Sequence, residues 1–245
     1  MSDVIGFQAV RSVLRENSER ARRLYVQRGR RDGRMSELIG LARAAGLRHQ
    51  TMDAQWFRRR VGEAVHQGVL LECHEAALAD FETMLAQWDS FGPQPLLLLL
   101  DGITDPRNYG ACLRSASGAG VDVVIVPKHK TAPLSAVALK TAQGGSEDLL
   151  IVEVTNLARA MNALRDLQVW IVGTDGDAPT EFRQMQAEGP LAIVMGGEEK
   201  GLRRLTREQC DQLVHIPMQG SVSSLNVSVA TAVVLYEAQR QRLES

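Results

Sequence analysis

The sequence lacks the features of membrane and secreted proteins. No apolar run reaches the roughly 18 residues that a membrane-spanning helix needs, and no basic start followed by an apolar stretch marks a signal peptide. We therefore expect a soluble, cytoplasmic protein with no membrane contact. Its 245 residues, 44% of them hydrophobic, suffice for one large domain or for two smaller ones with their own cores.

Cysteine is scarce, and no CxxC pair occurs. Cys73, Cys112 and Cys210 are odd in number and widely separated, which argues against a disulfide framework and against a zinc site. We expect three buried thiols. No other cluster of metal-ligating residues stands out, so we expect no bound metal.

Two common nucleotide-binding signatures are also missing. No GxGxxG follows an apolar strand with an acidic residue about 20 positions later, which argues against a nicotinamide-dependent Rossmann enzyme. No phosphate-binding GxxxxGK[ST] loop occurs.

Lysine is absent from the first 60 residues, which contain 14 arginines and 6 acidic residues, a net charge of +8. Residues 61–245 carry −9, so the overall charge of −1 hides a basic amino-terminal part. Arginine favours forked contacts to phosphate and stacking on bases, which indicates RNA binding; a solvated helix face is the alternative. The arginines form two clusters: Arg20, Arg22, Arg23, Arg28, Arg30, Arg31 and Arg34, and then Arg58 to Arg60.

Changes in composition divide the chain into three parts. Residues 1–75 mix helical spacing with short apolar stretches and predict a small α/β module. Residues 76–95 are typical of a linker with a helical portion and end in the turn-prone FGPQP. Residues 96–245 alternate apolar runs with helical stretches, as a mainly parallel sheet requires. The strands expected in this last part are Leu96–Leu100, Asp122–Val126, Leu149–Val154, Val169–Gly173, Leu191–Met195 and Leu213–Ile216.

Glycine and polar residues follow three of these strands. The segments are DGITDPRNYG after the five-leucine run, GGEEKG after Met195, and a Gly/Ser loop before the last helix, which Ser224 or Asn226 can cap. In the first segment a helix is expected to begin between Pro106 and Gly110, which places Arg114 about one turn from its start. Ligands bind outside the carboxyl ends of strands in open α/β sheets.

Together, DPRNYGACLRSA, IVMGGEEKG and IPMQGSVSSLNVSVA resemble the three ordered motifs of the SpoU/TrmH branch of the SPOUT RNA 2′-O-ribose methyltransferases. The amino-terminal IGFQAVRSVL and GEAVHQGVLLE resemble those members that use S-adenosylmethionine to methylate a guanosine of large-subunit ribosomal RNA near the peptidyl-transferase centre. The resemblance covers nearly the whole chain. It implies an α/β fold whose mainly parallel sheet carries a C-terminal trefoil knot, a rare exception among folds. It also implies a small N-terminal α/β RNA-binding domain and a homodimer formed through the C-terminal domain.

The resemblance further implies the site residues. The loops of the second and third motifs would hold S-adenosylmethionine without any metal, and the glycine at 196 would let the ligand approach the backbone. The cofactor-binding residues are Gly196, Ile216 and Leu225, with Met195, Gly197, Pro217 and Met218 nearby. The family's functional residues correspond to Asn108, Arg114, Glu198, Ser224 and Asn226.

The chemistry of these side chains constrains their roles. A guanidinium hardly ever deprotonates, so Arg114 suits the binding of phosphate or of a developing oxyanion better than proton removal. Glu198 could orient Arg114 or accept the proton, although a carboxylate near a helix start is also favoured by the helix dipole. His129 and His215 are titratable alternatives, and a satisfied core histidine is the simpler interpretation of His215.

The sequence departs from the family pattern at two places, and two other functions are left open. Leu139–Asp148 stands where relatives commonly have a serine-glycine-alanine stretch, and Lys200 is an extra basic residue, so the local loop shape is open. The rival functions are a transfer-RNA 2′-O-ribose methyltransferase and a non-catalytic RNA-binding protein that kept the fold. The N-terminal module resembles ribosomal-protein-like RNA-binding domains and favours ribosomal RNA.

Overall fold

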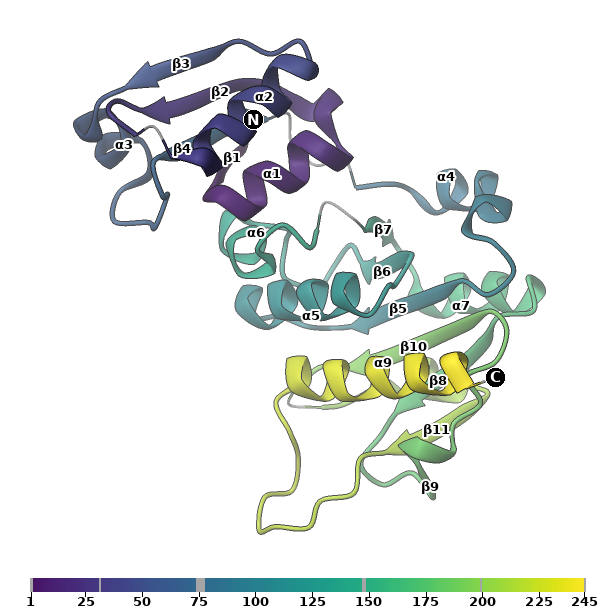
Figure 1. Cartoon of the computed structure of the whole chain (residues 1–245). Coiled ribbons are helices and arrows are strands. Elements are labelled where there is room, and N and C mark those ends of the chain that lie inside the picture. Colours follow the sequence, from purple (N-terminus) through teal and green to yellow (C-terminus); the bar gives the residue numbers. More distant parts are fainter. Residues whose placement is uncertain (1, 31, 74–77, 147–148, 199, 245) are drawn as a thin grey trace. The chain divides into compact units, whose positions relative to one another are not determined.

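The computed structural model describes residues 2–30, 32–73, 78–146, 149–198 and 200–244. The chain forms two compact units, Met1–Ala77 with Ala142–Asp148, and Leu78–Thr141 with Leu149–Ser245. Figure 1 shows the helices and strands of both units.

The first unit is built on a four-stranded sheet with the order β1-β4-β2-β3, in which only β2 and β3 run parallel. Apolar side chains of two helices, among them Val10 and Leu38, cover one face of the sheet, and Phe57 of a third helix packs on Tyr25 and Leu70 of the other face. The elements are β1 (Ser2–Ile5), α1 (Phe7–Glu16), η1 (Ser18–Arg20), β2 (Ala21–Gln27), α2 (Gly33–Ala44), β3 (His49–Met52), α3 (Ala54–Val61) and β4 (Val69–Cys73).

The sequence pattern misses part of this unit. The strand β3 is an edge strand with the polar sequence HQTM, and all of its residues except Met52 are exposed. It therefore shows no alternation of apolar and polar residues that could mark it as a strand. The short helix α3 begins where the Asp53 side chain accepts a hydrogen bond from the Trp56 backbone N–H at 2.7 Å.

The second unit contains a seven-stranded sheet in which every neighbouring pair is parallel, with the order β7-β6-β5-β10-β8-β11-β9. The carboxyl ends of all these strands therefore lie along one edge. The six strands expected from the sequence are confirmed to within one residue at each end, and only the two-residue β9 was not foreseen. The strands are β5 (Leu96–Asp101), β6 (Val123–Pro127), β7 (Leu150–Val154), β8 (Trp170–Thr174), β9 (Thr180–Glu181), β10 (Leu191–Gly196) and β11 (Gln212–His215).

The central strands of this sheet are buried on both faces. The residues Leu96 to Leu100 of β5 are at most 1% exposed, as the five-leucine run predicts. On one face, Met84, Met161 and Leu164 pack against the sheet. On the other, the last helix packs against α5 and β10 (Figure 1). The helices are α4 (Phe81–Ala86), η2 (Trp88–Phe91), α5 (Pro106–Gly118), α6 (Ala136–Ala142), α7 (Leu157–Asp166), η3 (Phe182–Gln184), α8 (Arg204–Glu208) and α9 (Val227–Glu244).

The segment expected to be a linker belongs to the second unit from Leu78 onward. Ala79 forms a parallel bridge with Val152, and Met84 of α4 is fully buried against the sheet. Burial of one methionine side chain stabilises a fold by about 2 kcal/mol. This segment therefore contributes to the core of the second unit, which its turn-rich composition does not reveal.

The scarce cysteines are free thiols. Cys73 and Cys112 are buried, as expected, whereas Cys210 is half-buried. Burial raises the pKa of the Cys112 thiol to about 11 and that of Cys210 to about 12. Both are therefore protonated and weakly reactive at neutral pH.

Among the described residues, no helix is both long and apolar enough to span a bilayer.

Candidate active site at the carboxyl edge of the sheet

The first polar segment follows β5 and starts α5. The Asp105 side chain accepts a hydrogen bond from the Arg107 backbone N–H at 2.6 Å, and Pro106 is the first helical residue, a typical capped start. The helix therefore begins earlier than expected from the sequence, which placed Arg114 about one turn from its start. Arg114 lies about two turns into α5 rather than on a loop. Asn108 is in the first turn, at the edge of the sheet.

The second polar segment follows β10, and its glycines serve the chain's own packing. The Gly197 N–H donates to the Asp101 carbonyl at 3.0 Å, and Gly197 forms an antiparallel bridge with Gly201. A Cβ atom at Gly196 would lie 2.2 Å from the Gly201 carbonyl carbon, and one at Gly197 would lie 2.7 Å from the Gly102 oxygen. Packing alone therefore requires glycine at 196 and 197, because backbone atoms of the chain occupy the space that a Cβ would take. The close approach of a ligand to Gly196 stays a prediction.

The third polar segment leads into α9. The Asn226 Oδ1 atom accepts hydrogen bonds from Ser228, from its backbone N–H at 3.0 Å and from its hydroxyl at 2.6 Å. Of the two expected caps, Asn226 is the one used, whereas Ser224 is an exposed residue of the preceding loop. Within the described part of the chain, no backbone hydrogen bond holds residues 218–225, so their N–H and C=O groups are available to a ligand.

Hydrogen bonds join one side chain from each of the three segments. The Asn226 Nδ2 donates to the Asn108 Oδ1 at 3.1 Å, and the Asn108 Nδ2 donates in turn to the Glu198 Oε1. Both ends of the Asn108 amide are therefore fixed, with its donor directed at Glu198. The Glu198 carboxylate is thus held in one orientation by an amide donor.

The other predicted site residues are not part of this hydrogen-bonded chain. Arg114 is exposed and forms no hydrogen bond or ion pair with any other described residue. The structure thus gives Glu198 an orienting partner in Asn108 and not in Arg114. Met195 is buried, and the rest of the predicted cofactor set is half-buried except the exposed Leu225: Gly196, Gly197, Ile216, Pro217 and Met218. Arg31 and Glu199 lie outside the described residues.

The chain is similar to known proteins over nearly its whole length. The sequence model described as "SpoU rRNA Methylase family" matches residues 95–236, more than half of the chain. The chain belongs to the SpoU rRNA methylase family. A second model, "RNA 2'-O ribose methyltransferase substrate binding", matches residues 4–79.

Relatives of this SpoU methylase match over its whole length. It is 46% identical over 243 residues to the 23S rRNA (guanosine-2'-O-)-methyltransferase RlmB of Pectobacterium atrosepticum, with 99% of each chain covered. It is 46% identical over 246 residues to RlmB of Escherichia coli strain K12, covering 99% of this chain and 100% of that one. The fold matches the crystal structure of the SpoU methyltransferase AviRb from Streptomyces viridochromogenes with the cofactor AdoMet. In that match the TM-score is 0.82 at 24% identity, and 99% of this chain and 91% of that chain are covered.

One residue of the SpoU methylase site was missed by the sequence interpretation. Asp101, at the end of β5, has a fully buried side chain whose Oδ2 accepts from the Arg203 N–H at 3.0 Å, while Oδ1 lies 3.3 Å from the Arg203 Nη1. Its carbonyl oxygen also holds Gly197. Asp101 thus anchors both ends of the loop that carries Glu198. A carboxylate placed at the end of an apolar strand was the available signal.

The two histidines raised as alternatives differ in surroundings. His129 is exposed on the loop between β6 and α6. His215, at the end of β11, has a buried Nδ1 with no hydrogen-bond partner among the described residues. The expected interpretation of a satisfied core histidine is therefore wrong for this nitrogen, which lies one residue before the proposed cofactor loop.

The loop of the third motif suits a nucleoside ligand such as S-adenosylmethionine. Residues 218–225 offer free backbone donors and acceptors, which suit an adenine ring and a ribose. No group of three or more His, Cys, Asp or Glu side chains in the described ranges is arranged to hold a metal ion.

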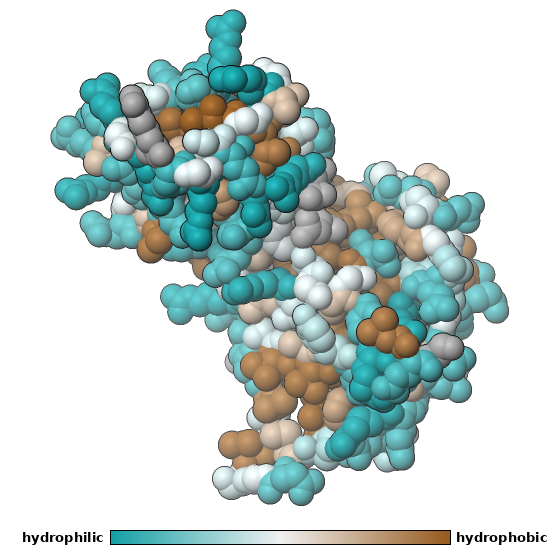
Figure 2. Space-filling view, viewed as in Figure 1, coloured by the Kyte–Doolittle hydropathy of each residue, from teal (hydrophilic) through white to brown (hydrophobic). Residues whose placement is uncertain are grey.

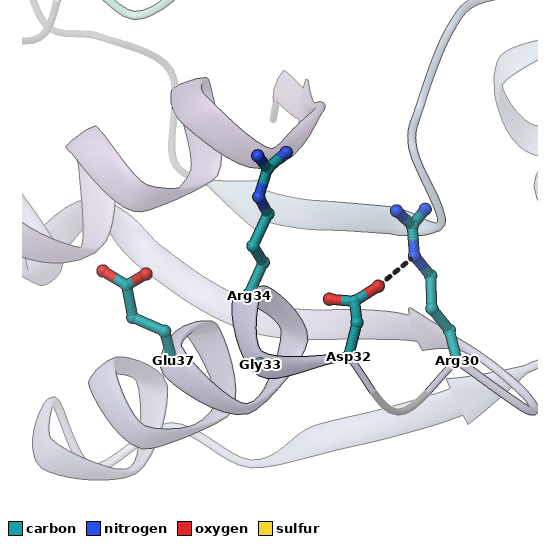
Figure 3. Close-up of a pocket in the computed structure, with 5 residues that line it drawn as sticks. All are labelled: Arg30, Asp32, Gly33, Arg34 and Glu37. Carbon is teal, nitrogen blue, oxygen red and sulfur yellow. Dashed lines mark hydrogen bonds and ion pairs between the residues drawn. The ribbon is translucent and has the colours of Figure 1, made fainter.

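The arginine-rich first unit of the SpoU methylase has a surface pocket of about 610 Å³. Figure 3 shows that charges of both signs line it, and the Arg30 Nε lies 2.9 Å from the Asp32 Oδ2. A second carboxylate of the lining, Glu37, is 2.8 Å from Arg15. Part of the arginine charge is therefore neutralised within the unit. The lining residues are Arg30, Asp32, Gly33, Arg34 and Glu37.

Proposed function

We propose that this protein is an S-adenosylmethionine-dependent enzyme that methylates the ribose 2′-hydroxyl of a guanosine in 23S ribosomal RNA. The observation that carries the proposal is the hydrogen-bonded chain of Glu198, Asn108 and Asn226, one residue from each family motif. Relatives with this activity are 46% identical over nearly the full chain. The target guanosine lies near the peptidyl-transferase centre, and the enzyme works in the cytoplasm, where its substrate is made.

The bound cofactor supplies an electrophilic methyl group on a cationic sulfonium. The protein must hold the ribose hydroxyl in line with it and accept the hydroxyl proton. Glu198 is the proton acceptor, because its carboxylate is oriented by Asn108 and has a second oxygen with no partner among the described residues. Arg114 remains a cation throughout and holds a phosphate or the developing oxyanion.

The loops of the second and third motifs carry the proposed cofactor-binding residues and Ser224. Free backbone groups of residues 218–225 support cofactor binding by the loop that follows Ile216 and Pro217. Ser224, exposed on this loop, positions substrate or cofactor by a hydrogen bond. The proposed cofactor-binding residues are Met195, Gly196, Gly197, Ile216, Pro217, Met218 and Leu225.

We also propose a division of labour between the units. The first unit binds the RNA substrate through its arginines, and the second carries out methyl transfer. The charge distribution supports this, since the +8 of the first 60 residues lies in the first unit.

A homodimer formed through the second unit is supported by a stripe of exposed, large apolar side chains on α9. Val229, Tyr236 and Leu243 are spaced seven residues apart and are 49%, 56% and 85% exposed. Figure 2 shows apolar side chains on this face, over the first half of α9 and the loop before it. A second copy of the chain is the occupant we propose. Light scattering should give a dimer for the wild type and a monomer for Val229→Glu.

A trefoil knot is the remaining element of the proposed fold. Its support is that α9 packs on α5 and on the central β10, although β11, the last strand before it, lies near the far edge of the sheet. The chain must therefore return across the sheet after β11. Experimental density for residues 216–244 would show whether this return passes through a loop.

The decisive experiment is methyl transfer to defined RNA. The purified protein should transfer the methyl group to an unmodified 23S rRNA transcript, and mass spectrometry of nuclease digests should find a single 2′-O-methylguanosine. Methylation of a tRNA transcript instead would favour the transfer-RNA alternative. Binding of RNA without affinity for S-adenosylmethionine would favour a non-catalytic RNA-binding protein.

A further inference from the structure

The basic residues of the second unit fall into two groups that differ in whether they have partners. One group is bound within the unit, and its members are Arg165, Arg183, Arg203, Arg204, Arg207, Arg240 and Arg242. The side chains of the other group form no hydrogen bond or ion pair within the described ranges, and its members are Arg107, Arg114, Lys128, Lys130, Lys140, Arg159 and Lys200. Residues 61–245 carry a net charge of −9, so acidic partners are not scarce.

Five of these unpartnered cations follow the carboxyl ends of four adjacent strands. Arg159 lies in the first turn of α7 after β7, and Arg107 in the first turn of α5 after β5. Lys128 and Lys130 lie after β6, and Lys200 lies after β10. Since the sheet order is β7-β6-β5-β10, they form one row along the edge that carries Glu198. At about 4.8 Å between neighbouring strands, the row spans about 14 Å.

The loop after β6 is held firmly while its charges stay in solvent. The Lys128 N–H donates to the Val154 carbonyl at 2.8 Å, and the Ala132 N–H donates to the Ile103 carbonyl at 2.7 Å. Between these anchors, the side chains of Lys128, His129 and Lys130 are all exposed. The backbone is therefore fixed by two neighbouring segments, yet the Lys128 and Lys130 side chains form no hydrogen bond or ion pair with any described residue.

The loop after β6 lies close to Gly102, and Gly102 lies close to Gly197, which precedes Glu198. A Cβ atom built at Gly102 would lie 3.7 Å from the Lys130 carbonyl oxygen. A Cβ atom built at Gly197 would lie 2.7 Å from the Gly102 carbonyl oxygen. Glu198 is the next residue. Lys130 also has a φ of 64°, in the left-handed region where glycine is the unstrained choice.

We propose that Lys128 and Lys130, flanked by Arg107, Arg159 and Lys200, form a phosphate-binding rim on the second unit. The rim contacts backbone phosphates of the RNA next to the nucleotide held at Glu198. Exposed lysines without acidic partners suit this role, because phosphate contacts position an RNA without reading its sequence. The inference rests on the proposed function, since it needs an RNA substrate at this edge.

The test variant is the full-length double substitution Lys128→Gln with Lys130→Gly, which removes two charges and relieves the backbone at position 130. Its binding to an unmodified 23S rRNA transcript is measured between about 50 and 200 mM salt. We expect roughly tenfold weaker binding at about 150 mM and a log–log salt slope lower by about 1.5, since each lost contact removes about 0.7 to 0.9. The thermal midpoint, the affinity for S-adenosylmethionine and kcat at saturating RNA should be retained.

Two control proteins separate the rim from general effects. Arg183→Gln with Arg240→Gln removes the same charge near the end of α9, where the Arg183 carbonyl accepts from Gln241. Gln168→Gly relieves a φ of 62° without removing any charge. Both should bind RNA as the wild type does.

Wild-type RNA affinity and salt slope in the Lys128/Lys130 variant would overturn the rim, and so would an equal loss in the charge-matched control. Failure of the wild type to methylate 23S rRNA would refute the proposed function instead. In that case the same slopes, measured on a tRNA transcript, would still decide whether the rim binds RNA.

Discussion

At the scale of single residues, some side chains of the proposed site carry charge, and others hold a charged neighbour in one orientation. Arg114 on α5 has no hydrogen-bond or ion-pair partner in the described part of the chain, whereas Glu198, Asn108 and Asn226 are hydrogen-bonded to one another. An arginine without an internal partner is free to hold a phosphate or an oxyanion of the substrate. The different roles of Arg114 and Glu198 lead to different expectations for substitution.

Arg114→Lys should retain part of the turnover, because it keeps the charge but not the forked geometry, while Arg114→Ala should lose about 100-fold or more. The affinity for S-adenosylmethionine should be unchanged in both, since the proposed cofactor loops lie elsewhere. Single-turnover methyl transfer and calorimetry on the same preparations measure the two quantities. Full activity of Arg114→Ala would remove this residue from the catalytic set.

Asn108→Asp should shift the acidic limb of the pH–rate profile to higher pH. A second carboxylate beside Glu198 repels its negative charge, so a proton acceptor at this position becomes active only at higher pH. Asn108→Ala is the control, because it removes the amide without adding charge. It should lower kcat without an upward shift of that limb. Identical pH profiles for the aspartate variant and the wild type would contradict Glu198 as the proton acceptor.

At the scale of secondary-structure elements, α9 is fixed at both ends. Its start is capped by Asn226, which belongs to the site, and Arg242 near its end binds four backbone carbonyls, those of Gln94, Pro95, Ala187 and Gly189. These carbonyls precede β5 and β10. The helix therefore connects the amino ends of the two central strands with the loops at their carboxyl ends.

Arg242→Ala should lower the free energy of unfolding by about 2 to 4 kcal/mol, because it takes the guanidinium donor from the part-buried contacts to the Ala187 and Gly189 carbonyls. Urea titration at fixed protein concentration measures this. Arg240→Ala on the same helix is the control, and a smaller loss is expected. Arg240 and Glu244 are exposed, and the largely buried Glu237 keeps its hydrogen bond from Gln241. An equal loss of unfolding free energy in the two variants would show that the backbone contacts of Arg242 stabilise the fold no more than the ion pairs of Arg240 do.

At the scale of the whole molecule, the chain joins an arginine-rich unit to an acidic unit that carries the site. The domain model for substrate binding covers residues 4–79, and the methylase model covers residues 95–236. Residues 80–94, which neither model covers, are part of the folded second unit, because α4 contributes the buried Met84 to its core. A test of the division of labour must therefore keep them.

The fragment 78–245 should bind S-adenosylmethionine like the full chain but bind and methylate 23S rRNA more weakly. Its RNA affinity should also depend less steeply on salt, because the arginines of the first unit and their phosphate contacts are gone. Calorimetry, filter binding and methyl transfer on both proteins measure these differences. Equal RNA affinities and equal salt slopes would contradict the proposed division.

Local patterns in the sequence determined much of this protein. Apolar runs bounded by glycine and polar residues predicted six strands of the parallel sheet, because a strand buried on both faces must be continuously apolar. The motifs named five site residues, of which Asn108, Glu198 and Asn226 are hydrogen-bonded to one another, and the cap at Asn226 was one of two local options.

Only the tertiary structure decided what depends on distant contacts. The burial of Met84, the approach of Gly201 to Gly196 and the anchoring of the Glu198 loop by Asp101 each join segments that no local pattern connects. The order of the strands also belongs here, since it follows from packing of the whole sheet. The hydrogen-bonded chain from Asn226 to Glu198 exists because this order brings the three loops to one edge.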